Sequence, residues 1–153
     1  MAVESNLVIV HYLDGTIMKG TTQDFFPNRP RFHLIDPSGK SVEVTCSDLK
    51  AAFFVKDLEG NPSRQDARGF ITAPGETVHG KKLAVRFKDG EILCGYSLSY
   101  VPGREGFFMF PADTGSNNLR VYVVANAAAE ICAGAAADKL AQKAVEAARR
   151  NAA

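Results

Sequence analysis

The chain has 153 residues, of which 46% are hydrophobic and 23% are charged. These proportions are ordinary for a folded globular protein and exclude an intrinsically disordered chain. The net charge of +1, from 18 basic and 17 acidic side chains, excludes a general long-range attraction to a polyanion, but not a local basic patch. No apolar stretch reaches the roughly 18 residues of a membrane span, so no membrane partner is predicted.

The N-terminal sequence and the cysteines predict a reduced, cytoplasmic protein. MAVESNLVIVHYLDG lacks the basic and then apolar regions of a secretory signal. Cys46, Cys94 and Cys132 are odd in number, form no CxxC pair and stand in apolar contexts, where a thiol behaves as a small hydrophobic group. We therefore expect no structural disulfide, metal or cofactor.

An internal repeat is the strongest pattern in the chain. VIVHYLDGTIMKG (8–20) aligns with LAVRFKDGEILCG (83–95), and FFPNRPRF (25–32) aligns with YVPGREGF (100–107), at the same offset of 75. Eight of the 28 positions from 8 to 35 are identical in the second copy, and they are turn and core residue types. This pattern predicts an internal duplication.

Each copy contains the signals of five short strands. Apolar and polar residues alternate in the first strand, an Asp-Gly pair is typical of a tight hairpin, and Gly20 or Gly95 indicates a bend in the second strand. A Pro-containing loop, an aromatic strand, a polar turn that is two residues longer in the second copy, and a fourth strand follow. A single helical turn, at 47–49 or 125–127, precedes the last strand. The expected strands are 8–13, 16–20, 31–36, 41–46 and 51–55 in the first copy, and 83–88, 91–95, 107–112, 119–124 and 128–132 in the second.

These elements predict a mainly β protein of two tandem small five-stranded barrels, SH3-like or Sm-like, with a C-terminal α-helix. In the alignment of the fifth strands, Phe53-Phe54 corresponds to Glu130-Ile131. The Ala-rich end of the chain has strong helix propensity. The expected boundaries are 6–57 for the first barrel, 58–80 for a linker, 81–132 for the second barrel and 133–150 for the helix.

The repeated Pro-x-Arg element supplies the first candidate ligand-binding residues. Arg29 and Arg104 follow Pro27 and Pro102 at the same point of each copy, next to aromatic residues. In one interpretation the two arginines form quasi-equivalent anion sites, with charge from Arg and stacking from the aromatic ring. In the other, Pro fixes the turn and Arg binds backbone carbonyls or the second barrel.

The linker supplies the second candidate pair, Arg64 and Arg68, in an RxxxR pattern. This pattern resembles the motif that PilZ domains, which bind cyclic di-GMP, carry ahead of a small β-barrel. Two arginine forks suit the phosphates and guanine edges of that ligand. The second PilZ element, (D/N)xSxxG, is not met, since the nearest stretch, 97–103, lacks the Asp or Asn and is one residue too long.

No catalytic pattern is found, and we predict that the chain is not an enzyme. His11, His33 and His79 have no metal-ligand spacing, and no GxSxG, HExxH or phosphate-loop motif is present. The Asp-Gly pairs lie between strands, where they are typical of turns rather than of carboxylate chemistry.

Beyond the general likeness to Sm-like barrels, the segments DGTIMKGTTQDFFPNRPRFHLID, DLKAAFFVKDLEG and FFMFPADTGSNNLRVYVV resemble an uncharacterised bacterial domain family that also occurs attached to signalling domains. The resemblance covers about residues 6–132 and implies architecture and a bacterial source, without an activity. The leading hypothesis is a non-enzymatic interaction module with a protein partner. The alternatives are Sm-like binding of RNA and binding of a cyclic dinucleotide. A homo-oligomer is also possible, since Sm-like barrels commonly close rings edge to edge.

Overall fold

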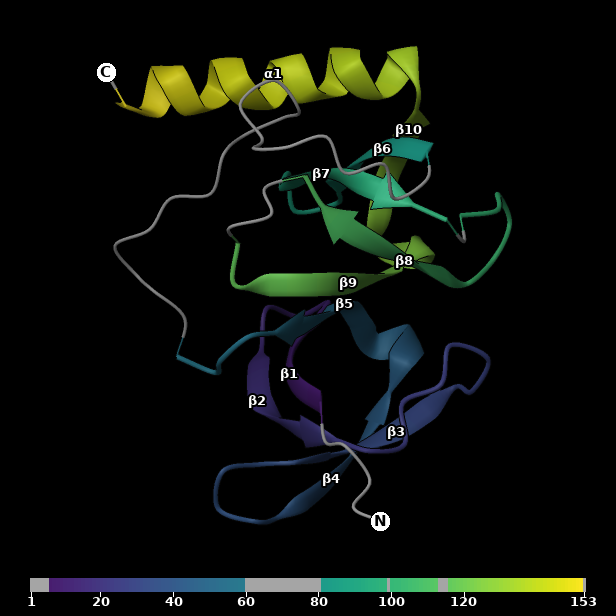
Figure 1. The fold of residues 1–153 in the computed structure, drawn as a ribbon, viewed down its shortest axis with the longest axis vertical. Coiled ribbons are helices and arrows are strands. Elements are labelled where there is room, and N and C mark those ends of the chain that lie inside the picture. The colour runs from purple at the N-terminus through teal and green to yellow at the C-terminus, as the bar shows by residue number, and fades with distance from the viewer. Residues whose placement is uncertain (1–5, 60–80, 99, 113–115, 153) are drawn as a thin grey trace.

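The computed structural model describes residues 6–59, 81–98, 100–112 and 116–152, which form a mainly β structure with one C-terminal helix (Figure 1). This confirms the mainly β class and the helix. The elements are β1 (Asn6–Tyr12), β2 (Ile17–Thr22), β3 (Arg31–Ile35), β4 (Ser41–Thr45), η1 (Cys46–Asp48), β5 (Leu49–Val55), β6 (Lys81–Phe87), β7 (Ile92–Ser97), β8 (Gly106–Pro111), β9 (Asn118–Val124), η2 (Ala125–Ala127), β10 (Ala128–Ala133) and α1 (Ala135–Ala152).

The strands of the described residues form a single antiparallel sheet in the order β10-β6-β7-β8-β9-β5-β1-β2-β3-β4. The order β5-β1-β2-β3-β4 in the first half matches the order β10-β6-β7-β8-β9 in the second half. A ladder between β5 and β9, with Phe53 opposite Val121, joins the halves. Two separate barrels are therefore not confirmed, because the last strand of the first half pairs with the fourth strand of the second.

The two Asp-Gly hairpins have the same geometry. Gly15 and Gly90 have φ angles of 92° and 97°, which a residue without a Cβ adopts readily. No described residue other than Gly has a positive φ, so Asp14 and Asp89 do not share this backbone conformation. Asp14 instead accepts a hydrogen bond from the Thr16 N–H at 2.8 Å, and Asp89 accepts one from the Glu91 N–H at 3.0 Å. The aspartates therefore stabilise the turns through their side chains.

Strands β5 and β9 are buried on both faces, and each contributes to two hydrophobic cores. The core of the first half takes Ala52, Phe54, Tyr122 and Val124 from these strands, and the core of the second half takes Ala51, Phe53, Val55, Val121 and Val123. Unbroken apolar runs of this kind are typical of strands covered on both sides. The two halves therefore share their packing as well as their hydrogen bonds.

The register corrects the predicted alignment of the later strands. Phe32 lies opposite Val44 and Phe107 lies opposite Val123, so the connection is four residues longer in the second half, not two. The fifth strands are consequently offset by two more residues than predicted, and Phe53 corresponds to Cys132. The helical turn of the first half is η1, one residue earlier than expected, whereas η2 is where the sequence predicts it.

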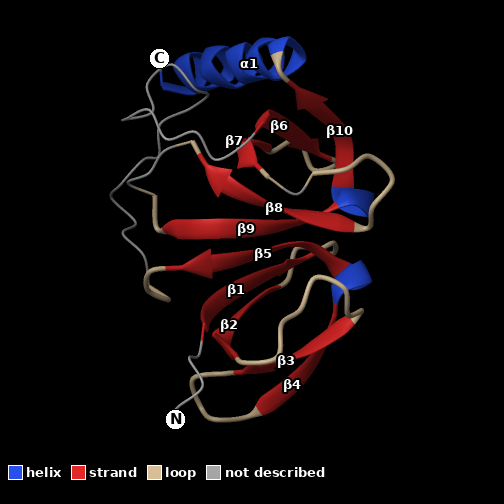
Figure 2. Cartoon of the chain, turned by 45° about the vertical axis from the view of Figure 1, so that its right-hand side comes forward, coloured by secondary structure: helices blue, strands red, loops and turns tan. Residues whose placement is uncertain are grey.

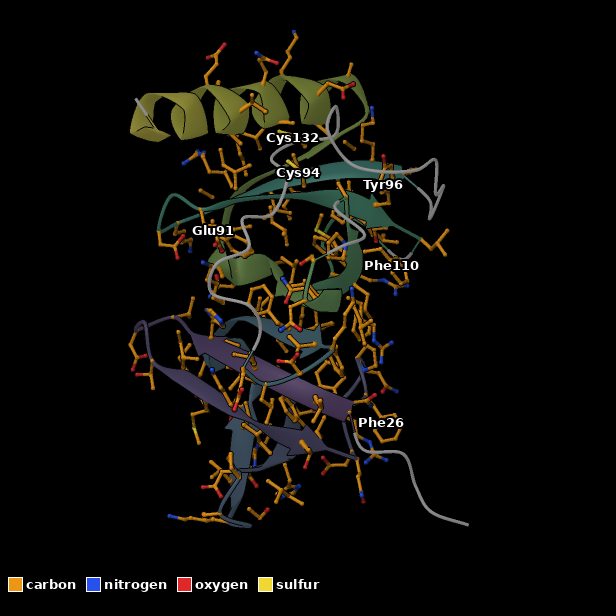
Figure 3. All side chains as sticks on the ribbon, turned by 60° about the vertical axis from the view of Figure 1, so that its left-hand side comes forward. Phe26, Glu91, Cys94, Tyr96, Phe110 and Cys132 are labelled. Carbon is orange, nitrogen blue, oxygen red and sulfur yellow. The ribbon has the colours of Figure 1, made fainter. Side chains whose placement is uncertain are left out.

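Helix α1 packs on β6, β7 and β10, with Cys94 and Cys132 lying beneath it (Figure 3). Both cysteines flank Ala84, on opposite neighbouring strands. Two strand spacings therefore separate their Cα atoms by roughly 9.5 Å, which is beyond the reach of a disulfide. Among the described residues, no helix combines the length and the apolar character needed to cross a membrane.

Candidate functional site

A cleft of about 620 Å³ lies where the two halves meet, and we call it the arginine cleft. It is built from the β2–β3 and β7–β8 loops together with the helical turns η1 and η2, which lie one above the other at the same end of the sheet (Figure 2). Its lining includes Arg29 and Arg104, the two arginines of the repeated Pro-x-Arg element. The other lining residues are Pro27, Pro30, Cys46, Ser47, Gly103, Glu105, Tyr122, Val124, Ala125 and Asn126.

Matching turns present the two arginines to the cleft. The Arg29 N–H donates to the Phe26 carbonyl at 3.0 Å, and the Arg104 N–H donates to the Val101 carbonyl at 3.3 Å. Proline occupies the second position of both turns, where its fixed φ is favourable. Gly103 has a φ of 90° at the third position of the second turn. Each loop therefore places its arginine at the end of a constrained turn.

Neither arginine of the cleft has a carboxylate within ion-pair distance in the described part of the chain. Arg29 instead stacks over the Phe26 ring, with its guanidinium carbon 4.8 Å from the ring centroid. Arg31, two residues later, does form an ion pair, with Glu43 at 3.6 Å. Since Glu105 is the one carboxylate among the described lining residues, these residues offer two exposed cations against one anion.

Two lining residues of the cleft, Cys46 and Tyr122, carry groups whose pKa is raised. Burial, and then the nearby Glu105 carboxylate, raise the pKa of the Cys46 thiol. Burial, followed by the charges of Cys46 and Glu105, also raises the pKa of the Tyr122 hydroxyl. The thiol is therefore poorly ionised at neutral pH and a weak nucleophile. These groups suit the cleft for hydrogen bonding to a ligand.

A second hollow, of about 360 Å³, lies between the two Asp-Gly hairpins and contains Lys50. The Lys50 ammonium bridges Asp89 and Glu91 of the other half at 2.7 Å each and lies 4.7 Å from the Phe87 ring centroid. Only 12% of the Lys50 side chain is exposed. The satisfied charges indicate that this hollow holds the halves together rather than receiving a ligand.

Replacing Lys50 by methionine is expected to lower the free energy of unfolding by about 1–2 kcal/mol at neutral pH. The stem still packs on Phe87, but two charged hydrogen bonds are lost, and the half-exposed carboxylates are rehydrated. The Lys50 hydrogen bond holds the pKa of Asp89 below its usual value. The contribution of Asp89 is thus present above about pH 4 and lost as the pH falls through its folded pKa.

Urea titration at several pH values measures this effect, with the exposed Lys19→Met as the matched control. A difference between wild type and Lys50→Met that stays undiminished as the pH falls through the folded pKa of Asp89 would contradict the ion-pair interpretation, since Asp89 loses its charge there.

The structure brings together Arg29 and Arg104, but Arg64 and Arg68 lie outside the described residues. His11 packs against the Phe53 ring, with centroids 4.6 Å apart, and burial lowers its pKa. His33 Nδ1 lies 2.7 Å from an Asp24 carboxylate oxygen, and this hydrogen bond raises the pKa of His33. No group of three or more His, Cys, Asp or Glu side chains suited to a metal is found in the described parts of the chain.

Sequence reasoning missed two cationic positions. Lys50 stands alone in an apolar run, which is a signal for a buried charge with a partner. Arg120 stacks over the rings of Phe54 and Phe108, with its guanidinium carbon 4.6 and 4.5 Å from their centroids. Burial lowers the pKa of Arg120.

Residues 4–134, which include the ten strands of the described residues and both loops of the arginine cleft, match the model of a family of unknown function, DUF6982. The chain belongs to this family. The match confirms the expectation of an uncharacterised domain. Searches of curated proteins and of solved structures give no significant match. The DUF6982 match ends directly before α1 begins at Ala135.

Proposed function

We propose that this DUF6982 protein is a non-enzymatic binding module whose arginine cleft takes an acidic segment of a protein partner. The observation that carries the proposal is that Arg29 and Arg104, from separate halves of the chain, line one cleft without carboxylate partners. The cleft volume of about 620 Å³ lies in the usual range for ligand sites. Guanidinium groups bind carboxylates in bidentate geometry.

A short acidic peptide fits the cleft better than a long polyanion does. Glu105 would repel a continuous chain of phosphates, and the net charge of +1 provides no long-range attraction to it. Ser47 and Asn126 add side-chain hydroxyl and amide groups that can bind a peptide backbone. The cleft thus combines two charge contacts with neutral hydrogen-bonding groups.

Single-stranded RNA is the second candidate ligand, and Phe26 is the observation that favours it. Phe26 is 46% exposed and lies beside Arg29, and rings next to arginines can stack on bases. Cyclic di-GMP binding through Arg64 and Arg68 stays a prediction from the sequence.

We also propose that the two halves are Sm-like or SH3-like barrels derived by duplication, in a cytoplasmic bacterial protein. Three correspondences support the duplication: the matching pairing order, the equivalent Asp-Gly turns, and the helical turn before each last strand. The bacterial source rests on the sequence resemblance, and the location rests on the odd number of cysteines, none of them in a CxxC pair.

Fluorescence anisotropy with a labelled octaglutamate peptide tests the ligand class. We expect saturable binding that Arg29→Gln and Arg104→Gln each weaken about tenfold or more, since each variant removes one charged contact. Arg31→Gln is the matched control, because this exposed arginine lies outside the lining.

Absence of peptide binding, or an equal loss in Arg31→Gln, would contradict the proposal. Binding of a labelled decauridine RNA in its place, weakened by Phe26→Ala, would establish the second candidate. Calorimetric titration with cyclic di-GMP tests the third candidate ligand, and Arg68→Ala should abolish any binding of it.

A further inference from the structure

Helix α1 covers one face of the second half of the sheet. Ala137 and Leu140 of the helix are buried against Ala84, and Ile92, Cys94 and Cys132 pack around them. The face consists of neighbouring positions on β10, β6 and β7, because Ala84 lies opposite both cysteines. Figures 1 and 2 show the helix lying across this end of the molecule.

The corresponding face of the first half is covered by the second half. In the first half, Ile9 lies opposite both Phe53 and Lys19, so Ile9 takes the place of Ala84, and Phe53 takes the place of Cys132. Ile9 and Phe53 belong to the hydrophobic core formed with β6, β8 and β9 of the second half. Helix α1 thus covers the face of the second half that corresponds to the face of the first half covered by the second half.

Side chains on the covered face differ between the halves in ways that favour the helix. Leu7 of the first half corresponds to Lys82, whose ammonium lies 3.0 Å from the Asp138 carboxylate in the first turn of α1. The large Phe53 ring is replaced by the smaller Cys132 side chain. The second half therefore presents a flatter surface and a charge that holds the helix.

The other end of the sheet is a free edge in the described residues, formed by β4. Val44 corresponds to Val123, so Glu43 takes the place of Tyr122. Tyr122 is buried at the joint between the halves, whereas Glu43 is exposed and paired with Arg31. A charged residue on an edge strand disfavours the addition of another strand.

We infer that α1 is a terminal cap on a surface that would otherwise receive a second copy of this chain. Without the cap, β4 of one chain could pair with β10 of the next in the way that β9 pairs with β5. This head-to-tail contact would not close on itself and could continue into longer assemblies. The DUF6982 match ends at residue 134, so the cap lies beyond the family domain.

Sedimentation velocity of four full-length variants tests the inference. Glu43→Tyr gives β4 the residue that β9 carries, and we expect this variant to stay monomeric because α1 still covers the receiving face. Combining it with Leu140→Asp undocks the helix, and the weight-average mass should rise about twofold or more with concentration. Leu140→Asp alone should associate more weakly, since Glu43 is retained. Glu43→Tyr with Lys139→Asp, on the exposed side of α1, is the control and should stay monomeric.

Hydrogen exchange locates the contact, with protection expected to increase in β4 and β10 of the associated variant. Association of the Glu43→Tyr variant alone would overturn the inference. So would a double variant, Glu43→Tyr with Leu140→Asp, that stays monomeric although hydrogen exchange shows that its helix has undocked. Association without protection of β4 would overturn it as well. Leu140→Ser in the same background repeats the test should aspartate unfold the second half.

Discussion

Replacing Phe54 by alanine is expected to lower the free energy of unfolding by about 3–5 kcal/mol, the usual cost of removing a buried aromatic ring. Phe54 is 2% exposed and lies on β5, the strand shared by both halves. Its ring contacts Phe25 and Phe108, with centroids 5.2 and 5.7 Å apart, and supports the Arg120 guanidinium. The loss therefore affects the packing of both halves.

Urea denaturation followed by circular dichroism measures this loss, and hydrogen exchange shows which half opens. Because β5 and β9 belong to both cores, we expect a single transition in which β1 and β6 amides lose protection together. Ile17→Ala, at a side chain that is 53% exposed, is the control and should have little effect. Two separate transitions would mean that the halves fold independently.

Alanine at Gly20 or at Gly95 is expected to destabilise the protein by about 3 kcal/mol, at the upper end of overpacking costs. A Cβ at Gly20 would collide with the Ile35 carbonyl oxygen, and a Cβ at Gly95 would collide with the Phe110 carbonyl oxygen. Neither backbone oxygen can rotate away as a flexible side chain would. The backbone of β3 therefore passes directly against Gly20, and the backbone of β8 passes directly against Gly95.

Thermal denaturation of both variants measures this cost, with Lys19→Ala as the control at an exposed position on β2. An unchanged melting temperature in either glycine variant would show that the neighbouring strand can move away. Equal losses of melting temperature at Gly20 and Gly95 would support equivalent close backbone contacts in the two halves.

Local patterns predicted most of the strands. Alternating side chains and the Asp-Gly pairs placed β1, β2, β6 and β7 correctly, because strand period and turn chemistry are local properties. The alignment of the later strands between the two halves was displaced, because the length of the connection before β9 has no local marker. The register of the ladders corrected that displacement.

The joint between the halves is a tertiary property that the repeat concealed. The apolar runs Ala51–Val55 and Val121–Val124 indicate burial on both faces, but a run of this kind does not identify the strand beside it. Both were interpreted as parts of separate barrels, whereas they pair with each other.

The candidate site was predicted residue by residue but not as one cleft. The repeat identified Arg29 and Arg104 as equivalent positions. Their meeting depends on the β5–β9 ladder, which brings η1 and η2 together. Lys50 was missed because its partners, Asp89 and Glu91, lie about forty residues away in the sequence.

The ladder between β5 and β9 also makes this chain suitable for fragment complementation. A cut between Glu59 and Lys81 would give two polypeptides, each carrying one apolar strand that the other normally covers. Each fragment alone would expose that strand and is expected to aggregate. Expressed together, the fragments should reassemble into a soluble heterodimer that restores the cleft, much as the parts of a split reporter do.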